Sequence, residues 1–344
     1  MAANRAGEKM KKQNRNGVKV LWAVDAFHEN PKKQLRALQS FLKLSGSAGT
    51  CVQPVSVLHS GSFDPVSATF PQNWHELASA ALDNLINALE NVANVVVSPI
   101  RLLKVDRPSL SASVDAFIQF AIEENTSLIL VSSSARKGVE RLVLGSFAET
   151  LVLRSPVPVL IVSPQAKTHQ KITTLLYPTD FSTASKKGFD RVLTLARILG
   201  MQVLLFHKVR LPYTNRSIGV MLPPVSRDSL RELKSEFAET AGNWAKRGEH
   251  SGVRTKFHIE MEGGPPLDSI LKASRRLGAK AMIAMTSQSG KWSATILGSL
   301  TRQVLRSAPC PVLVVHADQP SLAKKLVEEV RSAGYAYTAH PLIS

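Results

Sequence analysis

Cysteine, long apolar runs and leader-like segments are scarce or absent in this sequence. The two cysteines, Cys51 and Cys310, lie far apart, and neither belongs to a CxxC or Cys/His spacing. This excludes a disulfide framework and a cysteine-based metal site. No run of eighteen or more apolar residues occurs, so we expect no membrane-spanning helix. The basic residues 1–17 are not followed by the apolar core of a secretory signal. We therefore expect a cytoplasmic protein.

Catalytic signatures are missing as well. The sequence contains no GxSxG, no GxxxxGK[ST] and no HExxH, and no GxGxxG follows the first predicted strand of either repeat unit described below. The acidic residues form no evident catalytic pair. Only 6% of the residues are aromatic, and no recognised nucleic-acid-binding motif occurs. These absences predict no catalytic residues and no metal site.

The sequence does contain enough apolar residues for two cores, together with a large excess of positive charge. Of the 344 residues, 44% are hydrophobic and 20% are charged, which is typical of a globular protein with about two domains. The formal net charge is +17. Residues 20–165 carry eleven Lys or Arg against twelve Asp or Glu, whereas residues 166–320 carry twenty-three against eleven. This asymmetry favours an anionic partner for the second half.

An internal repeat divides the chain. GSFAETLVLRSPVPVLIV begins at Gly145, and GSLTRQVLRSAPCPVLVV begins 153 residues later at Gly298. An earlier pair, VLWAVD ending at Asp25 and LLYPTD ending at Asp180, is offset by 155 residues. The repeat predicts two similar units in tandem. We assign a basic N-terminal tail to residues 1–17, the two domains to 18–164 and 165–318, and a C-terminal tail to 319–344.

Each unit alternates short apolar runs with amphipathic stretches. Strands are predicted at residues 18–25, 52–59, 95–103, 128–132 and 157–162, and again at 172–180, 203–209, 253–261, 279–287 and 311–316. In the second unit helices are predicted at 182–199, 226–250 and 298–307, and Gly200 is the expected C-cap of the first of these. Buried parallel strands separated by helices predict a doubly wound α/β fold in each unit. The C-terminal tail contains a helical stretch that either docks on a domain or is loose.

Two features of each unit are expected at the carboxyl ends of the strands, where open parallel sheets bind ligands. One is the aspartate that ends the first strand, Asp25 or Asp180. The other is the segment from the fourth strand to the Gly-Ser that starts the next helix. Backbone N–H groups at a helix start, a hydroxyl and a nearby Lys or Arg suit a phosphate.

Purely structural roles remain open for the same residues. Asp180 also suits a helix cap, and Ser146 and Ser299 suit helix starts. A histidine near a strand end, such as His207, is more often a hydrogen-bonded core residue than a catalyst. Cys310 is expected to pack as a small hydrophobe.

These residues resemble those of a known family. The run YPTDFS around Asp180 and the closing ILGSLTRQVLRSAPCPVLVV resemble the universal stress protein family. LGSFAETLVLRSPVPVLIV resembles a second, more diverged copy. The resemblance implies two Rossmann-like (adenine nucleotide alpha hydrolase-like) domains, each a five-stranded parallel sheet flanked by helices. It also implies a role in the stress response.

The resemblance implies a nucleotide site as well. ATP-binding members carry G-x2-G-x9-G-[S/T], and here both units keep the last Gly and Ser but lack the first two glycines. Ser132 and Ala135 stand at the missing positions of the first unit, and Met285 and Gln288 at those of the second. The lost backbone access predicts weak or absent nucleotide binding, with ATP and Mg as the alternative. The residues implied for the second site are Pro178, Thr179, Asp180, Val209, Gln288, Gly290, Lys291, Gly298 and Ser299; those of the diverged first site are Asp25, Ser132, Ala135, Gly145 and Ser146.

Three functions follow from these observations. The first is a non-catalytic stress-response module that acts through assembly and partner binding. The second is a sensor that binds adenine nucleotides, with any slow ATPase activity incidental. The third is a basic protein that binds nucleic acid or another polyanion through residues 166–320. We predict that the two units pair as a pseudo-dimer through PVLIV and PVLVV, because an outer strand needs cover. Whether the whole chain forms a homodimer is left open.

Overall fold

The computed structural model describes most of both repeat units. The described residues are 18–27, 31–45, 50–64, 66, 69–89, 96–132, 145–162, 171–209, 226–261, 263–289, 295–296, 298–317 and 337–341. The predicted N-terminal tail lies outside them, as do three predicted site residues, Ala135, Gly290 and Lys291.

Strands and helices alternate along both units, as the hydrophobic pattern predicts. The first domain contains β1 (Lys19–Ala23), α2 (Pro31–Ser45), β2 (Cys51–Leu58), η1 (Ser60–Ser62), α3 (Trp74–Leu89), β3 (Val96–Val97), β4 (Arg101–Val105), α4 (Leu110–Glu123), β5 (Leu128–Ser132), α5 (Ser146–Arg154) and β6 (Val159–Val162). The second contains β7 (Thr174–Pro178), α6 (Thr183–Ile198), β8 (Gln202–Lys208), α7 (Arg227–His250), β9 (Thr255–Glu260), α8 (Pro266–Leu277), η3 (Gly278–Lys280), β10 (Ala281–Ser289), β11 (Thr295–Ile296), α9 (Ser299–Ser307) and β12 (Val312–His316). A last strand, β13 (Tyr337–Pro341), follows.

The strands of the described residues form one sheet of 13, in the order β13-β4-β2-β1-β5-β6-β12-β10-β7-β8-β9, with β3 on β2 and β11 on β10. Within each domain five of these strands run parallel. The predicted α/β, Rossmann-like fold is confirmed. The expectation of exactly five strands per domain is incomplete, because β3, β11 and β13 join the sheet outside the two parallel sets.

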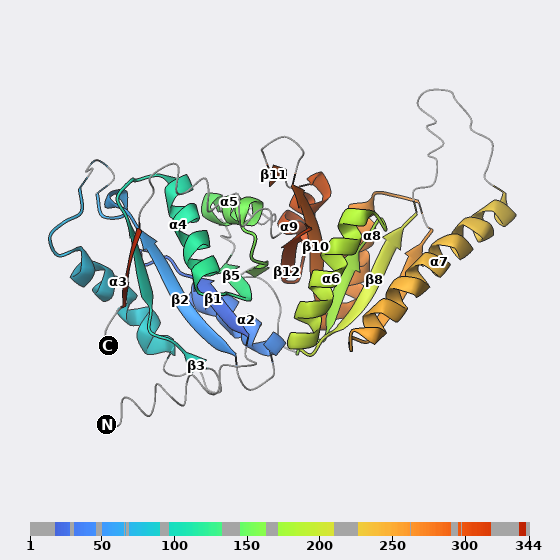
Figure 1. Ribbon diagram of the computed structural model, residues 1–344, viewed down its shortest axis with the longest axis horizontal. Coiled ribbons are helices and arrows are strands. Elements are labelled where there is room, and N and C mark those ends of the chain that lie inside the picture. The colour runs from blue at the N-terminus through green and yellow to red at the C-terminus, as the bar shows by residue number, and fades with distance from the viewer. Residues whose placement is uncertain are drawn as a thin grey trace.

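The two domains meet edge to edge through their fifth strands (Figure 1). β6 and β12 pair antiparallel, with Leu160 opposite Leu313. This confirms the predicted pairing of PVLIV with PVLVV. His316 at the end of β12 adds a hydrogen bond across the junction, its Nε2 donating to the Val152 carbonyl at 2.8 Å. The antiparallel contact between two parallel sets relates the domains by an approximate two-fold axis.

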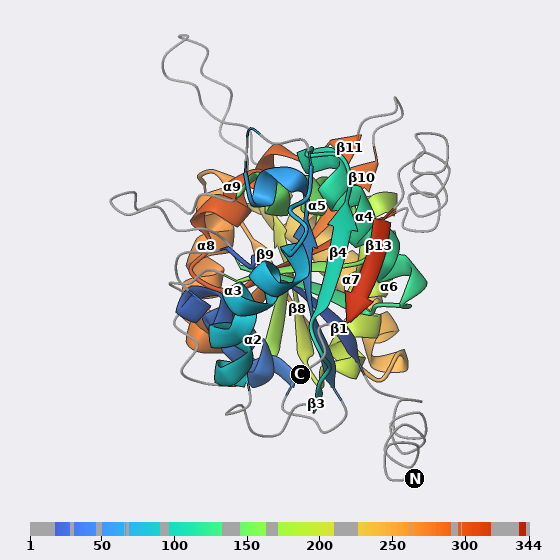
Figure 2. The ribbon, with the colours of Figure 1, turned by 90° about the vertical axis from the view of Figure 1, so that its left-hand side faces the viewer.

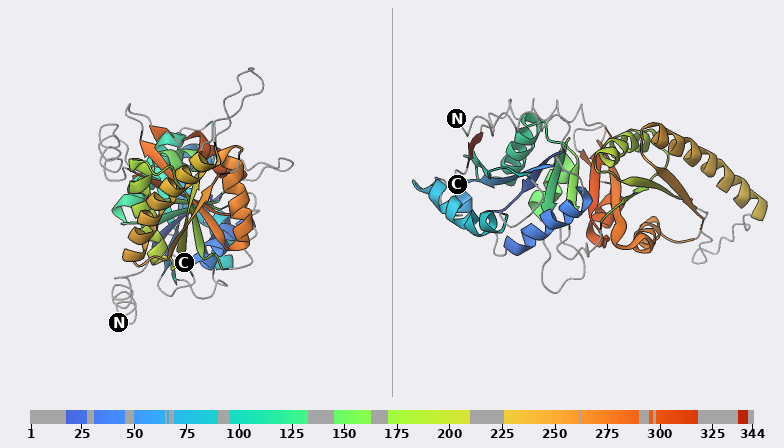
Figure 3. Two further views of the ribbon diagram at one scale, coloured as in Figure 1. Left: turned by 90° about the vertical axis from the view of Figure 1, so that its right-hand side faces the viewer. Right: turned by 90° about the horizontal axis from the view of Figure 1, so that it is seen from below.

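Helices cover both faces of this sheet, and each apolar layer continues from one domain into the other. α2, α3, α6 and α7 contribute to one layer, which includes Leu38, Phe189 and both Leu160 and Leu313. α4, α5, α8 and α9 contribute to the other layer, on the opposite face. The view from below in Figure 3 shows helices on both sides of the sheet in each domain. The continuous layers make the pair of domains one packed unit.

The two domains differ in whether a further strand pairs with the outer strand of the parallel set. On the first domain, β13 pairs antiparallel with β4, so that part of the predicted C-terminal tail docks there (Figure 2). Tyr337 of β13 packs edge-on against Phe120 and donates a hydrogen bond to Glu123, and His340 packs against Trp74. On the second domain, no described strand covers β9.

The third strand of the first domain differs from its prediction. It is expected at 95–103, but the structure divides this stretch into β3 and β4. Val52 and Val55 of β2 face Val97 and Arg101, so the outer strand holds one extra residue. Pro99 lies in this bulge, where its missing N–H costs no ladder bond, and its carbonyl accepts a hydrogen bond from Gln53 Nε2 at 2.9 Å.

Local signals at the helix ends are confirmed. Ser182 and Ser226 are the N-caps of α6 and α7, each accepting a hydrogen bond from a backbone N–H three residues on. Gly200 follows α6 with φ +63°, the left-handed conformation that favours glycine. None of the helices in the described part of the chain has the length and hydropathy needed to span a membrane.

Candidate functional site

Each domain has a pocket at the carboxyl ends of its parallel strands, where the sequence places a ligand site. The first-domain pocket has a volume of about 460 Å³ and the second-domain pocket about 600 Å³. Both volumes are within the range of small-molecule sites. Described residues that line the second pocket include Pro178, Thr179, Asp180, Ser185, His207, Lys208, Val209, Leu233, Phe237, Ile270, Met285, Thr286 and Leu300.

A hydrogen-bonded bridge fixes the floor of the second pocket. The buried Tyr177 hydroxyl donates to the Ser185 carbonyl at 2.6 Å and lies 2.6 Å from the Thr286 hydroxyl. This links the start of α6 to β10. Gly188 allows the close approach, because a Cβ there would lie 2.1 Å from Thr286 Oγ1. Burial raises the pKa of Tyr177, so its hydroxyl stays protonated.

Asp180 is held in place by the residues that cap α6. Its Oδ1 accepts hydrogen bonds from the Ser182 N–H at 3.0 Å and the Ser185 hydroxyl at 2.5 Å. Burial acts to raise the pKa of Asp180, but these hydrogen bonds outweigh it and keep the pKa below its ordinary value. Asp180 is therefore ionised at neutral pH. It supports the cap formed by Ser182 rather than being the cap itself.

An aromatic wall stands beside Asp180. Phe181 adopts φ +58°, which is unusual for an aromatic residue, and its ring lies 4.9 Å from the His207 ring. His207 also lies 4.3 Å from the Phe237 ring, and its Nδ1 is 2.7 Å from the Thr179 carbonyl. Burial lowers the pKa of His207, against opposing contributions from that carbonyl and Asp180. His207 is thus the neutral, hydrogen-bonded residue that the sequence favours.

Lys208 is the one lining cation among the described residues of the second pocket. Its Nζ is buried and has no hydrogen-bond or ion-pair partner in the described part of the chain. A buried ammonium without a partner is unfavourable and attracts an anion. Lys208 is not among the site residues predicted from the sequence. A signal was present, since Lys208 lies near the end of a predicted strand, directly before the predicted site residue Val209.

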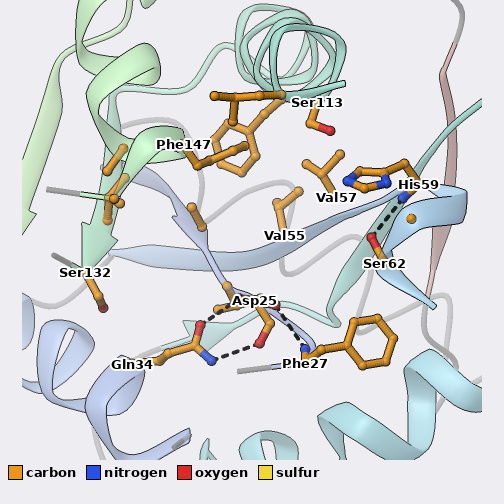
Figure 4. A pocket seen from close by; sticks show the side chains of 18 residues that line it. Asp25, Phe27, Gln34, Val55, Val57, His59, Ser62, Ser113, Ser132 and Phe147 are labelled. Atoms are coloured by element: carbon orange, nitrogen blue, oxygen red, sulfur yellow. Dashed lines mark hydrogen bonds between the residues drawn. The ribbon is translucent and has the colours of Figure 1, made fainter. Parts of the chain in front are cut away.

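The first pocket is built from different side chains (Figure 4). The Asp25 N–H donates to Gln34 Oε1 at 2.7 Å, and Gln34 Nε2 donates back to the Asp25 carbonyl at 3.0 Å. Asp25 Oδ1 accepts from the Phe27 N–H at 3.0 Å. Burial lowers the pKa of His59, so that it is neutral at neutral pH. Asp25 is therefore the one charged residue among the described residues that line this pocket.

Strand register gives the correspondence between the two pockets. Ala23 and Pro178 each lie two residues before the strand-end aspartate of their unit, Asp25 or Asp180. Ala23 pairs with Val55, and Pro178 pairs with Phe206. Two residues further on, Val57 in the first domain therefore corresponds to Lys208 in the second. Both line their pockets.

Strand pairing also changes which residue of the second domain corresponds to Ser132. Val131 and Met285 pair with Ile161 and Val314 of the equivalent strands β6 and β12. Ser132 therefore corresponds to Thr286, and not to Met285 as counting back from the shared Gly-Ser gives. The connecting segment differs in length by one residue, which counting alone does not reveal.

The structure brings together some predicted site residues and separates others. Pro178, Thr179, Asp180 and Val209 line the second pocket, and Asp25, Ser132 and Gly145 line the first. Ser146 and Ser299 begin α5 and α9 and are exposed, and neither they nor Gly298 belong to the described lining. Gln288 is placed in β10 by its backbone alone.

Two further groups are placed by the structure. Burial raises the pKa of Cys310 to about 12, which agrees with a packing role for this thiol. Among the described residues, no three His, Cys, Asp or Glu side chains are grouped so as to hold a metal ion.

Comparison with known proteins identifies the family. The model of the universal stress protein family matches the chain twice, over residues 18–163 and 171–316. A universal stress protein of Methanocaldococcus jannaschii is 29% identical over 143 residues, which cover 41% of this chain and 80% of that protein. The crystal structure of a universal stress protein from Archaeoglobus fulgidus aligns with a TM-score of 0.55 at 19% identity, over 87% of this chain and 98% of that one.

A structure from Pseudomonas aeruginosa aligns with a TM-score of 0.56 at 16% identity, over 93% of this chain and 99% of that one. At these identities the structural likeness shows the fold alone. The two family matches, which together span most of the sequence, show more. This chain belongs to the universal stress protein family and carries two of its domains in tandem.

Proposed function

We propose that this protein is a stress-response module that works by binding rather than by catalysis, and that its second domain binds an anionic small molecule of the adenine-nucleotide class. The buried ammonium of Lys208, which has no partner within the described part of the chain, carries this proposal. An anion beside it would replace the solvation that Lys208 loses on burial.

The remaining wall of the second pocket suits a nucleoside. Asp180 offers a carboxylate whose Oδ2 has no hydrogen bond among the described residues, and this oxygen suits an amino group. Phe237 and Leu233 offer apolar surface for a flat ring. The missing glycines of the phosphate motif favour weak nucleotide binding, whereas Lys208 favours tighter binding. The measured affinity for a nucleotide therefore distinguishes these two expectations.

Titration calorimetry with ADP and with adenosine, each with and without Mg²⁺, tests this proposal. We expect ADP to bind more tightly than adenosine, because only ADP pairs with Lys208. Lys208→Met should weaken ADP at least tenfold and leave adenosine unchanged, since hydrogen bonds to charged groups contribute about 1.5–3 kcal/mol. Lys246→Met, at a lysine outside the pocket lining, is the matched control. Equal affinity of wild type and Lys208→Met for ADP would overturn the proposal.

Assembly within one chain is the second part of the proposed function. The β6–β12 pairing and the continuous apolar layers hold the two pockets on one rigid sheet. The module would thus present both pockets to partners in a fixed arrangement. Homodimerisation of the whole chain and the domain limits at 164/165 and 318/319 stay predictions.

Polyanion binding is a second candidate, and the surface of α8 and α9 favours it. These helices pack side by side and expose Lys272, Arg275, Arg276, Arg302 and Arg306. Their first-domain counterparts α4 and α5 carry a single basic residue, Arg154. Binding to mixed RNA between about 50 and 200 mM salt tests this surface, because phosphate contacts weaken steeply over that range. Loss of binding in an Arg275→Gln/Arg276→Gln variant would support it, and no binding at the lowest salt would exclude it.

A further inference from the structure

The first-domain pocket retains the position of a ligand site but has lost the character of a nucleotide site. It opens at the ends of β1, β2 and β5, between these strands and the helices α4 and α5 (Figure 4). Asp25 is the one formal charge among the described residues of its lining. A carboxylate with no lining cation repels phosphates and other anions. The charge of the described lining residues therefore disfavours in this pocket the anionic ligands that the second pocket favours.

The walls of the first pocket are largely apolar and aromatic. Phe117 and Phe147 meet edge to face, with ring centroids 5.9 Å apart, and Phe27 lies near the rim. Val55 and Val57 of β2 add apolar surface to the same lining. Aromatic side chains in this arrangement favour a flat ring that packs against their faces or edges.

Three polar atoms of this wall are buried without a hydrogen-bond partner among the described residues: Ser113 Oγ, Ser132 Oγ and His59 Nδ1. Ser113 is only 6% exposed. Figure 4 shows Ser113 and His59 close to Val57, and Ser132 well apart from them at the end of β5, which lies on the other side of β1 from β2. Buried polar groups are almost always paired, so unpaired groups around a cavity indicate a missing hydrogen-bonding occupant.

The fold holds His59 in this wall. The His59 N–H donates to Ser62 Oγ at 3.1 Å, and the imidazole lies over Gly61, where a Cβ would come within 3.0 Å of Cε1. Glycine at position 61 therefore gives the ring the space it occupies. His59, neutral at neutral pH, offers both an acceptor and a donor nitrogen and no charge.

We propose that the first-domain pocket binds an uncharged aromatic molecule that carries a hydroxyl group. Its ring packs against Phe117 and Phe147, and its hydroxyl bonds to Ser113, with the neutral His59 nearby. This assignment does not depend on nucleotide binding by the second domain, because it concerns a different pocket with different lining residues.

Three naphthalene derivatives test the proposal on the full chain. 2-Naphthol is uncharged at pH 7 and carries a hydroxyl, 2-naphthoate carries a negative charge, and naphthalene has no polar group. Displacement of the neutral fluorescent probe N-phenyl-1-naphthylamine reports binding of each. We expect 2-naphthol to displace the probe, naphthalene to bind more weakly, and 2-naphthoate to bind least.

Variants locate the site. Ser113→Ala should weaken 2-naphthol about fivefold and leave naphthalene unchanged, as expected for one lost hydrogen bond. Val57→Phe should fill the pocket and abolish binding of both compounds. Leu233→Phe, at a half-buried lining residue of the second pocket, is the matched control and should leave binding unchanged. Circular dichroism of each variant confirms its fold.

Each contrary result overturns the proposal. Stronger binding of 2-naphthoate than of 2-naphthol would show that the pocket prefers anions. Loss of binding in Leu233→Phe but not in Val57→Phe would place the site in the second domain. No displacement by 2-naphthol would leave the first pocket without an aromatic ligand, even if ADP binds the second.

Discussion

The two pockets of this protein share a position in the fold and differ in electrostatic character. In the second domain the lining includes Lys208, whose buried Nζ has no partner among the described residues, and the ionised Asp180. In the first domain Val57 occupies the equivalent strand position, and Asp25 is the one charge among the described lining residues. The parallel sheet places a pocket at the same position in each domain. Our proposals for the two pockets rest on the difference in charge between Val57 and Lys208 at the equivalent strand position.

The pockets also differ in how their aspartates are used. Asp180 accepts hydrogen bonds from Ser182 and Ser185 and stabilises the start of α6. Asp25 accepts only the Phe27 N–H among the described residues, and Gln34 holds its backbone instead. Both domains thus carry a strand-end aspartate, but the hydrogen-bond partners of the two aspartates differ. The following predictions test this contrast, from the largest expected effect to the smallest.

Val57→Lys gives the first pocket the cation of the second. We expect the free energy of unfolding to fall by about 2–3 kcal/mol, because no described residue of that pocket other than Asp25 can compensate a half-buried ammonium. Binding of 2-naphthol should also be lost. Urea denaturation measures the stability, with Val57→Met as the control of similar length. Unchanged stability would mean that the two pockets are electrostatically more alike than their lining indicates.

Gly188→Ala and Gly61→Ala compare how closely neighbouring atoms pack around one glycine in each domain. A Cβ at Gly188 would lie 2.1 Å from Thr286 Oγ1 and 2.9 Å from Thr286 Cβ, so α6 or β10 must move. We expect a loss of about 1–2 kcal/mol. At Gly61 the nearest atoms belong to the His59 ring at 3.0 and 3.1 Å, and this side chain can shift at a cost below about 1 kcal/mol. Thermal unfolding of both variants measures the difference, and equal losses would contradict it.

Stability should depend on pH through buried histidines of both domains and of the junction. Burial lowers the pKa of His59, His207 and His316 below 6.5, so the unfolded chain binds protons more readily than the folded one. The stability is complete above pH about 6.5 and decreases as the pH falls through the folded-state pKa values. Urea titrations between pH 8 and pH 5 measure this. His207→Gln should reduce the slope, and an unchanged slope in that variant would exclude a contribution from His207.

Asp180→Ala and Asp25→Ala should differ modestly in stability. Asp180→Ala removes the hydrogen bonds that the carboxylate accepts from Ser182 and Ser185, whereas Asp25→Ala removes one that is accepted from the Phe27 N–H. Both carboxylates lie at the surface, so we expect about 1 kcal/mol for Asp180→Ala and about half of that for Asp25→Ala. The pKa of Asp180 is lowered, so its contribution should disappear only as the pH falls below its ordinary value, 3.8. A larger decrease in the free energy of unfolding for Asp25→Ala than for Asp180→Ala, measured by urea denaturation, would contradict this prediction.

Much of the fold follows from local sequence. The apolar runs locate all five parallel strands of the second domain to within about two residues, because each is bounded by glycine, proline or polar residues. Ser182, Ser226 and Gly200 mark helix ends through contacts with their own neighbours, which is why the sequence reveals them. Pro99 is also visible in the sequence. Its bulge is apparent only when β4 is aligned against β2.

The candidate site was only partly predictable. Asp25 and Asp180 follow directly from the repeat, and both line their pockets. Lys208 was missed because its importance depends on the burial of its Nζ without a partner among the described residues, and burial is set by tertiary packing. Ser113 was missed for the same reason, since it lies in the first turn of α4 and reaches the site only through the packing of that helix on the sheet.

The sequence by itself determined the two tandem α/β units, the strand-end aspartates and the apolar fifth strands that pair, because these depend on periodicity, repeats and local capping. Only the tertiary structure decided that Ser132 corresponds to Thr286, that Val57 corresponds to Lys208, and that β13 returns to cover β4 rather than β9. These features depend on strand register and on contacts between residues far apart in the chain. Such contacts are set by how whole elements pack, and no local pattern of residues encodes them.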